Sequence, residues 1–171
     1  MANENIRHRS TTGTRLTPLW LLDLCVEVMG SIDLDPCSEP GPPFNVPAKV
    51  HWTKNDDCLT QDAWLGNVFL NPPYGKKRGV EEILRKLDSE YMKRNVQQAC
   101  ALLPVDTSTG WWSILGYVYP WCAFAKRIKF DQLKTGAGYP SALFYLGHIE
   151  ENRERFMDTF SRVGQIYVPI H

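Results

Sequence analysis

The chain has 171 residues, and its 19 lysines and arginines balance its 19 aspartates and glutamates. Hydrophobic residues make up 43% and charged residues 22%, which excludes a disordered or fibrous chain and predicts one globular domain. No apolar run approaches the roughly 20 residues of a membrane helix, and the N-terminus has no signal-peptide core. The five cysteines are widely spaced and the four histidines form no zinc-ligand pattern, so we expect reduced thiols, no metal and a cytoplasmic location.

Charge is unevenly distributed along the chain. Residues 1–15 carry three arginines and one glutamate, whereas residues 16–75 carry eight acids and two lysines. The rest has fourteen bases and ten acids, with basic clusters at 76–78 and 126–129. A protein can bind a polyanion through one basic face without a basic total, so these clusters form either such a face or ordinary solvated surface.

The first predicted elements follow an N-terminal arm, residues 1–15, that we expect to be flexible. Thr17-Pro18 predicts a helix to about Met29, because Thr is a favourable N-cap and Pro suits the first helical position. Gly30 ends this helix, and residues 31–35 are predicted to be a short strand. Residues 36–50 contain five of the twelve prolines and are predicted to be an extended loop.

The remaining elements continue this alternation. We predict strands at 67–70, 99–103, 122–125, 142–146 and 165–168, and helices at 80–91, 109–119 and 150–163. Short apolar strands alternating with amphipathic helices predict an α/β fold, a mainly parallel sheet with helices on both faces. Ligands of such sheets bind at the carboxyl ends of the strands, where Asp33-Leu34-Asp35-Pro36, Asn71-Pro72-Pro73-Tyr74 and Pro104-Val105-Asp106 are found here.

The most specific motif is Asn71-Pro72-Pro73-Tyr74, directly after a buried strand. The Asn71 side-chain oxygen and the Pro72 carbonyl can each accept one N–H of a planar amino group, which favours a pyramidal nitrogen with a free lone pair. The prolines hold the backbone rigid, and Tyr74 offers a plane on which a base can stack. A proline-rich turn with a packed tyrosine is the alternative.

With these residues, the chain resembles the small phage-type, Dam-like DNA adenine-N6 methyltransferases, which use S-adenosylmethionine. The resemblance extends from about residue 10 to residue 147 and implies a class I, Rossmann-like methyltransferase domain over residues 16–171. Its segments occur in the family's order: Thr17-Pro18, Asp33-Leu34-Asp35-Pro36-Cys37, Asp57-Cys58-Leu59 with Trp64, Asn71-Pro72-Pro73-Tyr74-Gly75, Leu102-Leu103-Pro104 with Trp111-Trp112, and Arg127-Ile128-Lys129-Phe130.

The resemblance also implies roles for individual residues. Asn71, Pro72 and Tyr74 would be catalytic. The cofactor-binding residues would be Thr17, Pro18, Asp35, Pro36, Cys37, Asp57 and Asn71. Of the two strand carboxylates we favour Asp35 over Asp33, because it lies nearer the strand end. A helix cap would also explain Thr17, and a solvated turn would also explain Asp57.

Duplex DNA would be the substrate, with the target adenine flipped into the pocket. The DNA and base contacts would be Tyr74, Lys76, Lys77, Arg78, Arg127 and Phe130. A core position is the alternative for Phe130, and one of Trp111 and Trp112 is expected in the core. The setting would be a phage or prophage protein acting in the bacterial cytoplasm, with sequence specificity carried by loops 36–50 and 132–140.

Three other functions remain compatible with the motif. Enzymes that methylate the glutamine amide of release factors share it, but they normally add a helical domain and a glycine-rich cofactor loop that are missing here. Cytosine-N4 methyltransferases more often have Ser in place of Asn71. An inactive DNA- or protein-binding module is the alternative of another class, and the intact motif disfavours it.

Overall fold

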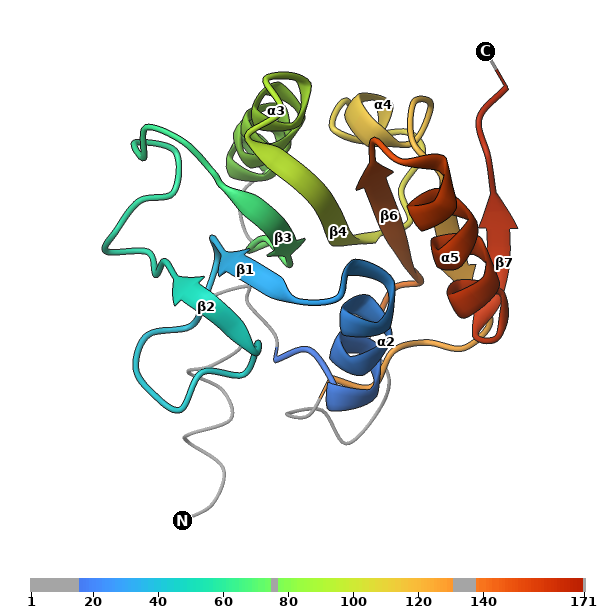
Figure 1. Cartoon of the computed structure of the whole chain (residues 1–171), viewed down its shortest axis with the longest axis horizontal. Helices are drawn as coiled ribbons and strands as arrows, with labels where there is room; N and C mark the ends of the chain where they lie inside the picture. The colour runs from blue at the N-terminus through green and yellow to red at the C-terminus, as the bar shows by residue number, and fades with distance from the viewer. Residues whose placement is uncertain (1–15, 75–76, 131–137, 171) are drawn as a thin grey trace.

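A computed structural model describes residues 16–74, 77–130 and 138–170, with the backbone alone for residues 77 and 78. The expected arm, residues 1–15, lies outside the described residues, as does most of loop 132–140. The chain forms a single seven-stranded sheet in the order β2-β1-β3-β4-β6-β5-β7 (Figure 1). The strands are β1 (Ile32–Asp35), β2 (Ala48–His51), β3 (Gly66–Leu70), β4 (Val96–Pro104), β5 (Trp121–Phe124), β6 (Ser141–Gly147) and β7 (Gly164–Tyr167).

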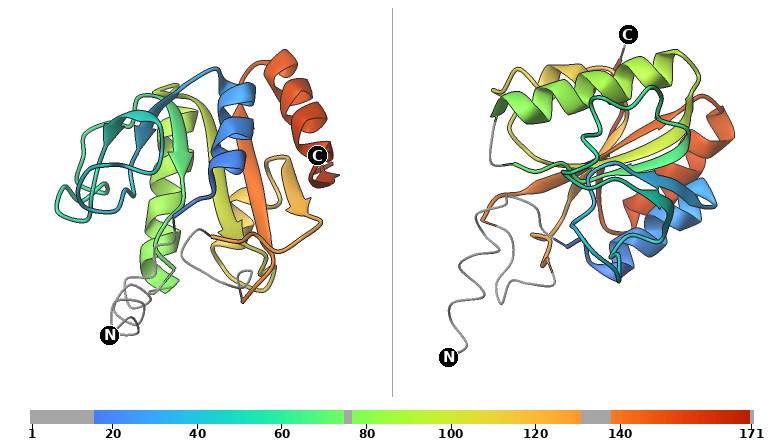
Figure 2. Two further views of the ribbon diagram at one scale, coloured as in Figure 1. Left: turned by 90° about the horizontal axis from the view of Figure 1, so that it is seen from below. Right: turned by 90° about the vertical axis from the view of Figure 1, so that its left-hand side faces the viewer.

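Helices cover both faces of this sheet, as predicted. Their bounds are α2 (Leu19–Met29), α3 (Lys77–Met92), α4 (Trp112–Leu115) and α5 (Glu150–Ser161). Figure 2 shows α3 on one face and α2 with α5 on the other. Each face has its own apolar core: Leu84, Val68 and Trp112 belong to the α3 side, and Leu22, Phe69 and Phe156 to the α2 and α5 side.

The strand directions decide where a ligand site can form. β2, β1, β3 and β4 are parallel, and β6 is antiparallel to both β4 and β5. β5 therefore shares the direction of the parallel strands, whereas β6 and β7 run the other way. The carboxyl ends of β1, β3, β4 and β5 consequently lie at one edge of the sheet, which we call the carboxyl edge.

Three local predictions need correction. Residues 48–51 form the edge strand β2 inside the expected loop; Pro47 can precede it because an edge strand tolerates proline at its start. The helix expected at 109–119 is only one turn, because Thr109 and Ser113 bond through their hydroxyls to the backbone and Gly110 and Gly116 flank the turn.

The third correction concerns the start of α2. Pro18 is the N-cap residue, the helix begins at Leu19, and no side chain caps it. Thr17 is therefore not the N-cap, and its buried hydroxyl is available to another partner. The end of the helix at Gly30 is as predicted, with Gly30 at a φ of 82°.

The carboxyl end of α3 contains a fully buried acid, Glu90. Its carboxylate accepts hydrogen bonds from Lys86 at 3.1 Å, Lys93 at 3.2 Å and Asn95 at 2.7 Å. Burial raises the pKa of the Glu90 carboxyl, but the hydrogen bonds from Asn95 and the two lysines outweigh burial and lower the pKa to about 2.

Candidate active site

A hollow opens at the carboxyl edge between β1, β3 and the start of α2. It encloses about 410 Å³ of empty space, part of it continuous with solvent. Four residues expected at the site line it: Thr17, Asp35, Cys37 and Asn71. The strand ends bring these residues together although 54 positions separate Thr17 from Asn71.

Asn71 is buried and its side-chain amide is held at both ends. The Nδ2 group donates to Thr17 Oγ1 at 3.2 Å, and Oδ1 accepts from the Tyr74 hydroxyl at 2.8 Å. The Thr17 and Tyr74 hydroxyls hold the amide between them, and the Thr17 hydroxyl accepts from its NH₂ group. An amide oxygen has two lone pairs and can accept from two donors.

Tyr74 lies over the end of β4. Its hydroxyl is 2.5 Å from the Leu102 carbonyl oxygen as well as hydrogen-bonded to Asn71. Its ring meets Tyr139 edge to face, with centroids 5.9 Å apart at 73°. Tyr139, which precedes β6, was not predicted at the site; its only sequence signal was its place in loop 132–140.

Asp35 ends β1 and is the buried carboxylate of the hollow. It accepts from Ser38 Oγ at 2.6 Å and from the Cys37 N–H at 3.1 Å. Burial raises the pKa of Asp35, and these two hydrogen bonds only partly oppose that effect.

Asp33 has a structural role instead. It accepts from Lys49 Nζ at 2.6 Å and from the Asn67 N–H at 2.8 Å, which ties β1 to both of its neighbours. Asp33 does not line the hollow, whereas Asp35 does.

The proline-rich loop between β1 and β2 supplies the remaining wall of the hollow. Ser38, Glu39 and Phe44 are lining residues that the motif analysis did not identify. Phe44 stacks on His51 with ring centroids 4.0 Å apart and planes 8° apart. The sequence feature that pointed to this wall was the proline content of the loop, because it indicated a rigid segment directly after Asp35.

The chemistry of this lining is compatible with S-adenosylmethionine. Asp35 and Glu39 would provide negative charge for its ammonium group and for the positive sulfonium, and Phe44 would provide an apolar plane for its adenine. The fit rests on the buried Asp35 carboxylate in the lining of the hollow and on the chemistry of these side chains.

The other predicted cofactor-binding residues do not line the hollow. Pro18 and Pro36 are buried but absent from its lining. Asp57 is exposed in a turn with a φ of 47° and accepts from the Leu59 N–H at 3.2 Å.

The residues expected to contact DNA differ in where the structure places them. Phe130 is buried in the core beside α2, and Arg127 is exposed at the end of β5. Lys76 and the side chains of Lys77 and Arg78 lie outside the described residues. Trp111 and Trp112 are both buried in the core on the α3 side.

Among the described residues, no three His, Cys, Asp or Glu side chains gather closely enough to hold a metal ion. Within the same ranges, no helix is long and apolar enough to cross a membrane.

A protein-family model matches most of the chain. The family model described as DNA N-6-adenine-methyltransferase (Dam) matches residues 9–136, which include Thr17, Asp35, Asn71 and Tyr74. No curated protein matches the chain significantly.

Proposed function

The chain belongs to the DNA N-6-adenine-methyltransferase (Dam) family, and we propose that it methylates the N6 amino group of adenine in duplex DNA, using S-adenosylmethionine and a flipped target base. The observation that carries this proposal is the Asn71 amide, buried beside the hollow and oriented by Thr17 and Tyr74. Family membership favours adenine over cytosine or a glutamine side chain as the acceptor.

The chain's own residues would act mainly by holding the amino group. S-adenosylmethionine supplies an activated methyl group on a positively charged sulfur. Asn71 Oδ1 accepts one N6–H, and the Pro72 carbonyl accepts the other. These two acceptors favour a pyramidal nitrogen, which reduces the delocalisation of its lone pair into the ring. They also stabilise the positive charge that develops on N6 during transfer. The surplus proton then leaves to water.

Binding and positioning would be divided between the two sides of Asn71. On one side, Asp35 and Glu39 bind the positively charged part of the cofactor. On the other, the ring of Tyr74 stacks on the flipped adenine, which contributes about 1–3 kcal/mol. Most of the acceleration then comes from holding the two reactants in line.

As the resemblance implies, the protein would be a phage or prophage enzyme that modifies DNA in the bacterial cytoplasm. Its sequence preference would come from the loops around the hollow, since residues 36–50 lie beside Asn71.

The test is transfer of tritiated methyl groups to plasmid DNA, followed by nucleoside analysis. Wild-type protein should produce N6-methyladenine, and Asn71→Ala should lower turnover at least a hundredfold while it still binds S-adenosylmethionine. Asn55→Ala, in an exposed turn, is the matched control and should retain full activity. N4-methylcytosine as the product, or transfer only to release factor, would identify one of the alternatives. Cofactor binding without any transfer would indicate the inactive binding module.

A further inference from the structure

Two large apolar side chains are exposed at the first turn of α2. Leu19 is 63% and Trp20 44% exposed, although the next two residues, Leu21 and Leu22, are fully buried. They follow Thr17 by two and three positions, so they stand at the carboxyl edge close to the residue that bonds to Asn71. Neither residue is needed to complete the core.

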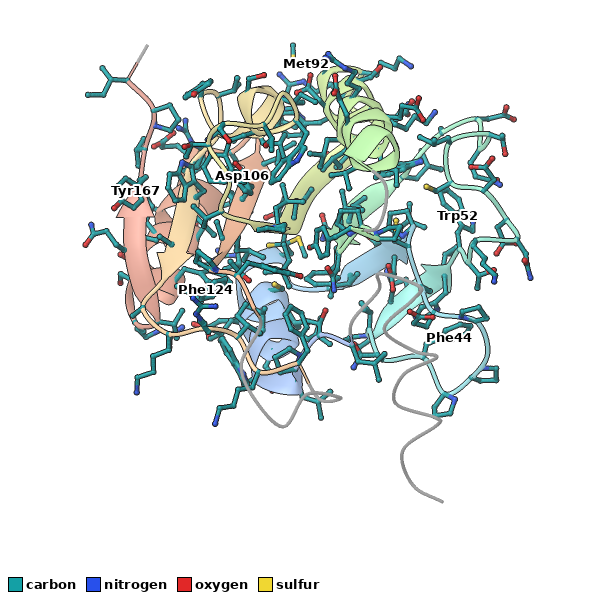
Figure 3. The ribbon with its side chains drawn as sticks, turned by 180° about the vertical axis from the view of Figure 1, so that it is seen from behind. Phe44, Trp52, Met92, Asp106, Phe124 and Tyr167 are labelled. Atoms are coloured by element: carbon teal, nitrogen blue, oxygen red, sulfur yellow. The ribbon has the colours of Figure 1, made fainter. Side chains whose placement is uncertain are left out.

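A basic segment lies against this turn. Residues 125–130 leave the carboxyl end of β5, and Trp20 meets Phe124 edge to face with centroids 6.1 Å apart. Figure 3 shows Phe124 next to α2. Ile128 and Phe130 are buried in the same core as Leu21 and Leu22, and this alternation leaves Lys126, Arg127 and Lys129 exposed. We call Leu19, Trp20, Lys126, Arg127 and Lys129 the α2–β5 face.

The charge of this face favours a polyanion. α2 itself carries two exposed acids, Asp23 one turn further along the helix and Glu27 near its far end, and Glu27 is paired with Arg162. Exposed apolar side chains flanked by lysines, next to the proposed site for a DNA base, are suited to binding a duplex in which one base pair is open. Proteins that open DNA commonly insert an apolar side chain between base steps and bind the flanking phosphates with lysine or arginine side chains.

We propose, on the basis of the proposed function, that the α2–β5 face receives duplex DNA beside the flipped adenine. Leu19 and Trp20 fill the space that the adenine leaves in the stack, and Lys126 and Lys129 bind the flanking phosphates. Two residues of chain span at most about 7 Å, so Leu19 lies within that distance of Thr17, the partner of Asn71.

The first test separates base opening from chemistry. After the modified sites have been mapped, methylation is measured on two synthetic duplexes, with the target adenine opposite either thymine or an abasic residue. Opening a paired base costs a few kcal/mol, and less without a partner. The double variant Leu19→Ala/Trp20→Ala should therefore lose about tenfold or more in kcat/KM on the paired duplex, and at most about threefold on the abasic one.

The control for this variant is Met92→Ala. Met92 is 69% exposed and lies at the opposite end of the sheet, where α3 ends before β4 begins. It should behave as wild type on both duplexes. Retained binding of S-adenosylmethionine would show that the double variant is folded. An equal loss on both duplexes, or no loss on either, would overturn the role of Leu19 and Trp20.

The second test measures phosphate contacts without any knowledge of the target site. In Lys126→Ala/Lys129→Ala, the dependence of log K on log salt for a 20-base-pair duplex should become shallower by about 2, since each phosphate contact contributes about 0.9. Lys93→Ala, at the far end of α3, should leave the slope unchanged. An unchanged slope in the double variant would overturn the phosphate contacts and would point to a protein partner for this face. Absence of methyl transfer by the wild type would refute the proposed function, whereas an active wild type with insensitive variants would refute only the α2–β5 face.

Discussion

The two parts of the Tyr74 side chain can be separated by mutation, because the ring and the hydroxyl have different partners. Tyr74→Phe keeps the ring beside Tyr139 but removes the hydroxyl that donates to Asn71 Oδ1 and lies against the Leu102 carbonyl. Tyr74→Ala removes both. The Asn71 amide is then held only by Thr17 among the contacts described above.

The expected magnitudes differ enough to be resolved. A neutral hydrogen bond contributes about 0.5–1.5 kcal/mol net, so Tyr74→Phe should lower kcat about two- to twelvefold through a less well-oriented acceptor. Loss of stacking adds about 1–3 kcal/mol, so Tyr74→Ala should lower kcat/KM by about a further five- to 150-fold. The loss from the ring should appear largely in KM for DNA, since a stacked base is bound before transfer as well as during it.

The assay is steady-state methyl transfer to DNA with saturating S-adenosylmethionine, together with cofactor titration of each variant. Both variants should bind the cofactor within about threefold of wild type, because Tyr74 does not line the hollow. If Tyr74→Phe lost as much activity as Tyr74→Ala, stacking would not be the role of the ring. If Tyr74→Phe were more active than wild type, the hydroxyl would be a competitor of adenine for Asn71 rather than its support.

Three further outcomes are expected. Thr17→Val should lower kcat about two- to twelvefold by releasing the other end of the Asn71 amide, and its effect should be non-additive with Tyr74→Phe in a double-mutant cycle; simple additivity would mean that the two contacts act independently. Asp35→Asn should weaken cofactor binding about tenfold or more, as measured by calorimetry. It should not lower Tm, because burial raises the pKa of Asp35 and its charged form therefore costs stability at neutral pH. Unchanged affinity would exclude Asp35 from the cofactor site. The folded-state pKa of Glu90 is about 2, below its ordinary value of 4.5, so the stability that its charge contributes is present above pH 4.5 and is lost as the pH falls through 2. Glu90→Gln should therefore lower the free energy of unfolding by on the order of 3 kcal/mol at pH 7, and by less at pH 3, as measured by urea unfolding. A difference between wild type and variant that does not change with pH would contradict this.

Much of the fold could be predicted because strand and helix periodicities are local. The strand before Asn71 and the helix after it follow from runs of apolar residues whose spacing fixes both their type and their buried face. The edge strand β2 could not be predicted, because its Lys49 and Val50 are exposed and Pro47 precedes it. An edge strand with little burial gives no apolar pattern, and its pairing with β1 is a tertiary property.

Some residues that line the hollow could be named from the sequence, but the contacts between them could not. Asn71 and Asp35 were identifiable because carboxylates and amides at strand ends are unusual. The partners that orient them were not: Thr17 had a sufficient local explanation as a helix cap, and Ser38 carries no signal of its own. Such contacts depend on which strand ends meet, which no short stretch of sequence encodes.

Thr17 bonds to Asn71 through its hydroxyl and is also one of the residues that line the hollow. A molecule that enters the hollow therefore meets the residue that holds the asparagine amide. Occupancy on one side of this threonine is in this way coupled to acceptor geometry on the other, which gives the enzyme a physical basis for loading its methyl donor before it engages a base. An order-of-addition experiment would show that coupling as tighter DNA binding in the presence of the donor.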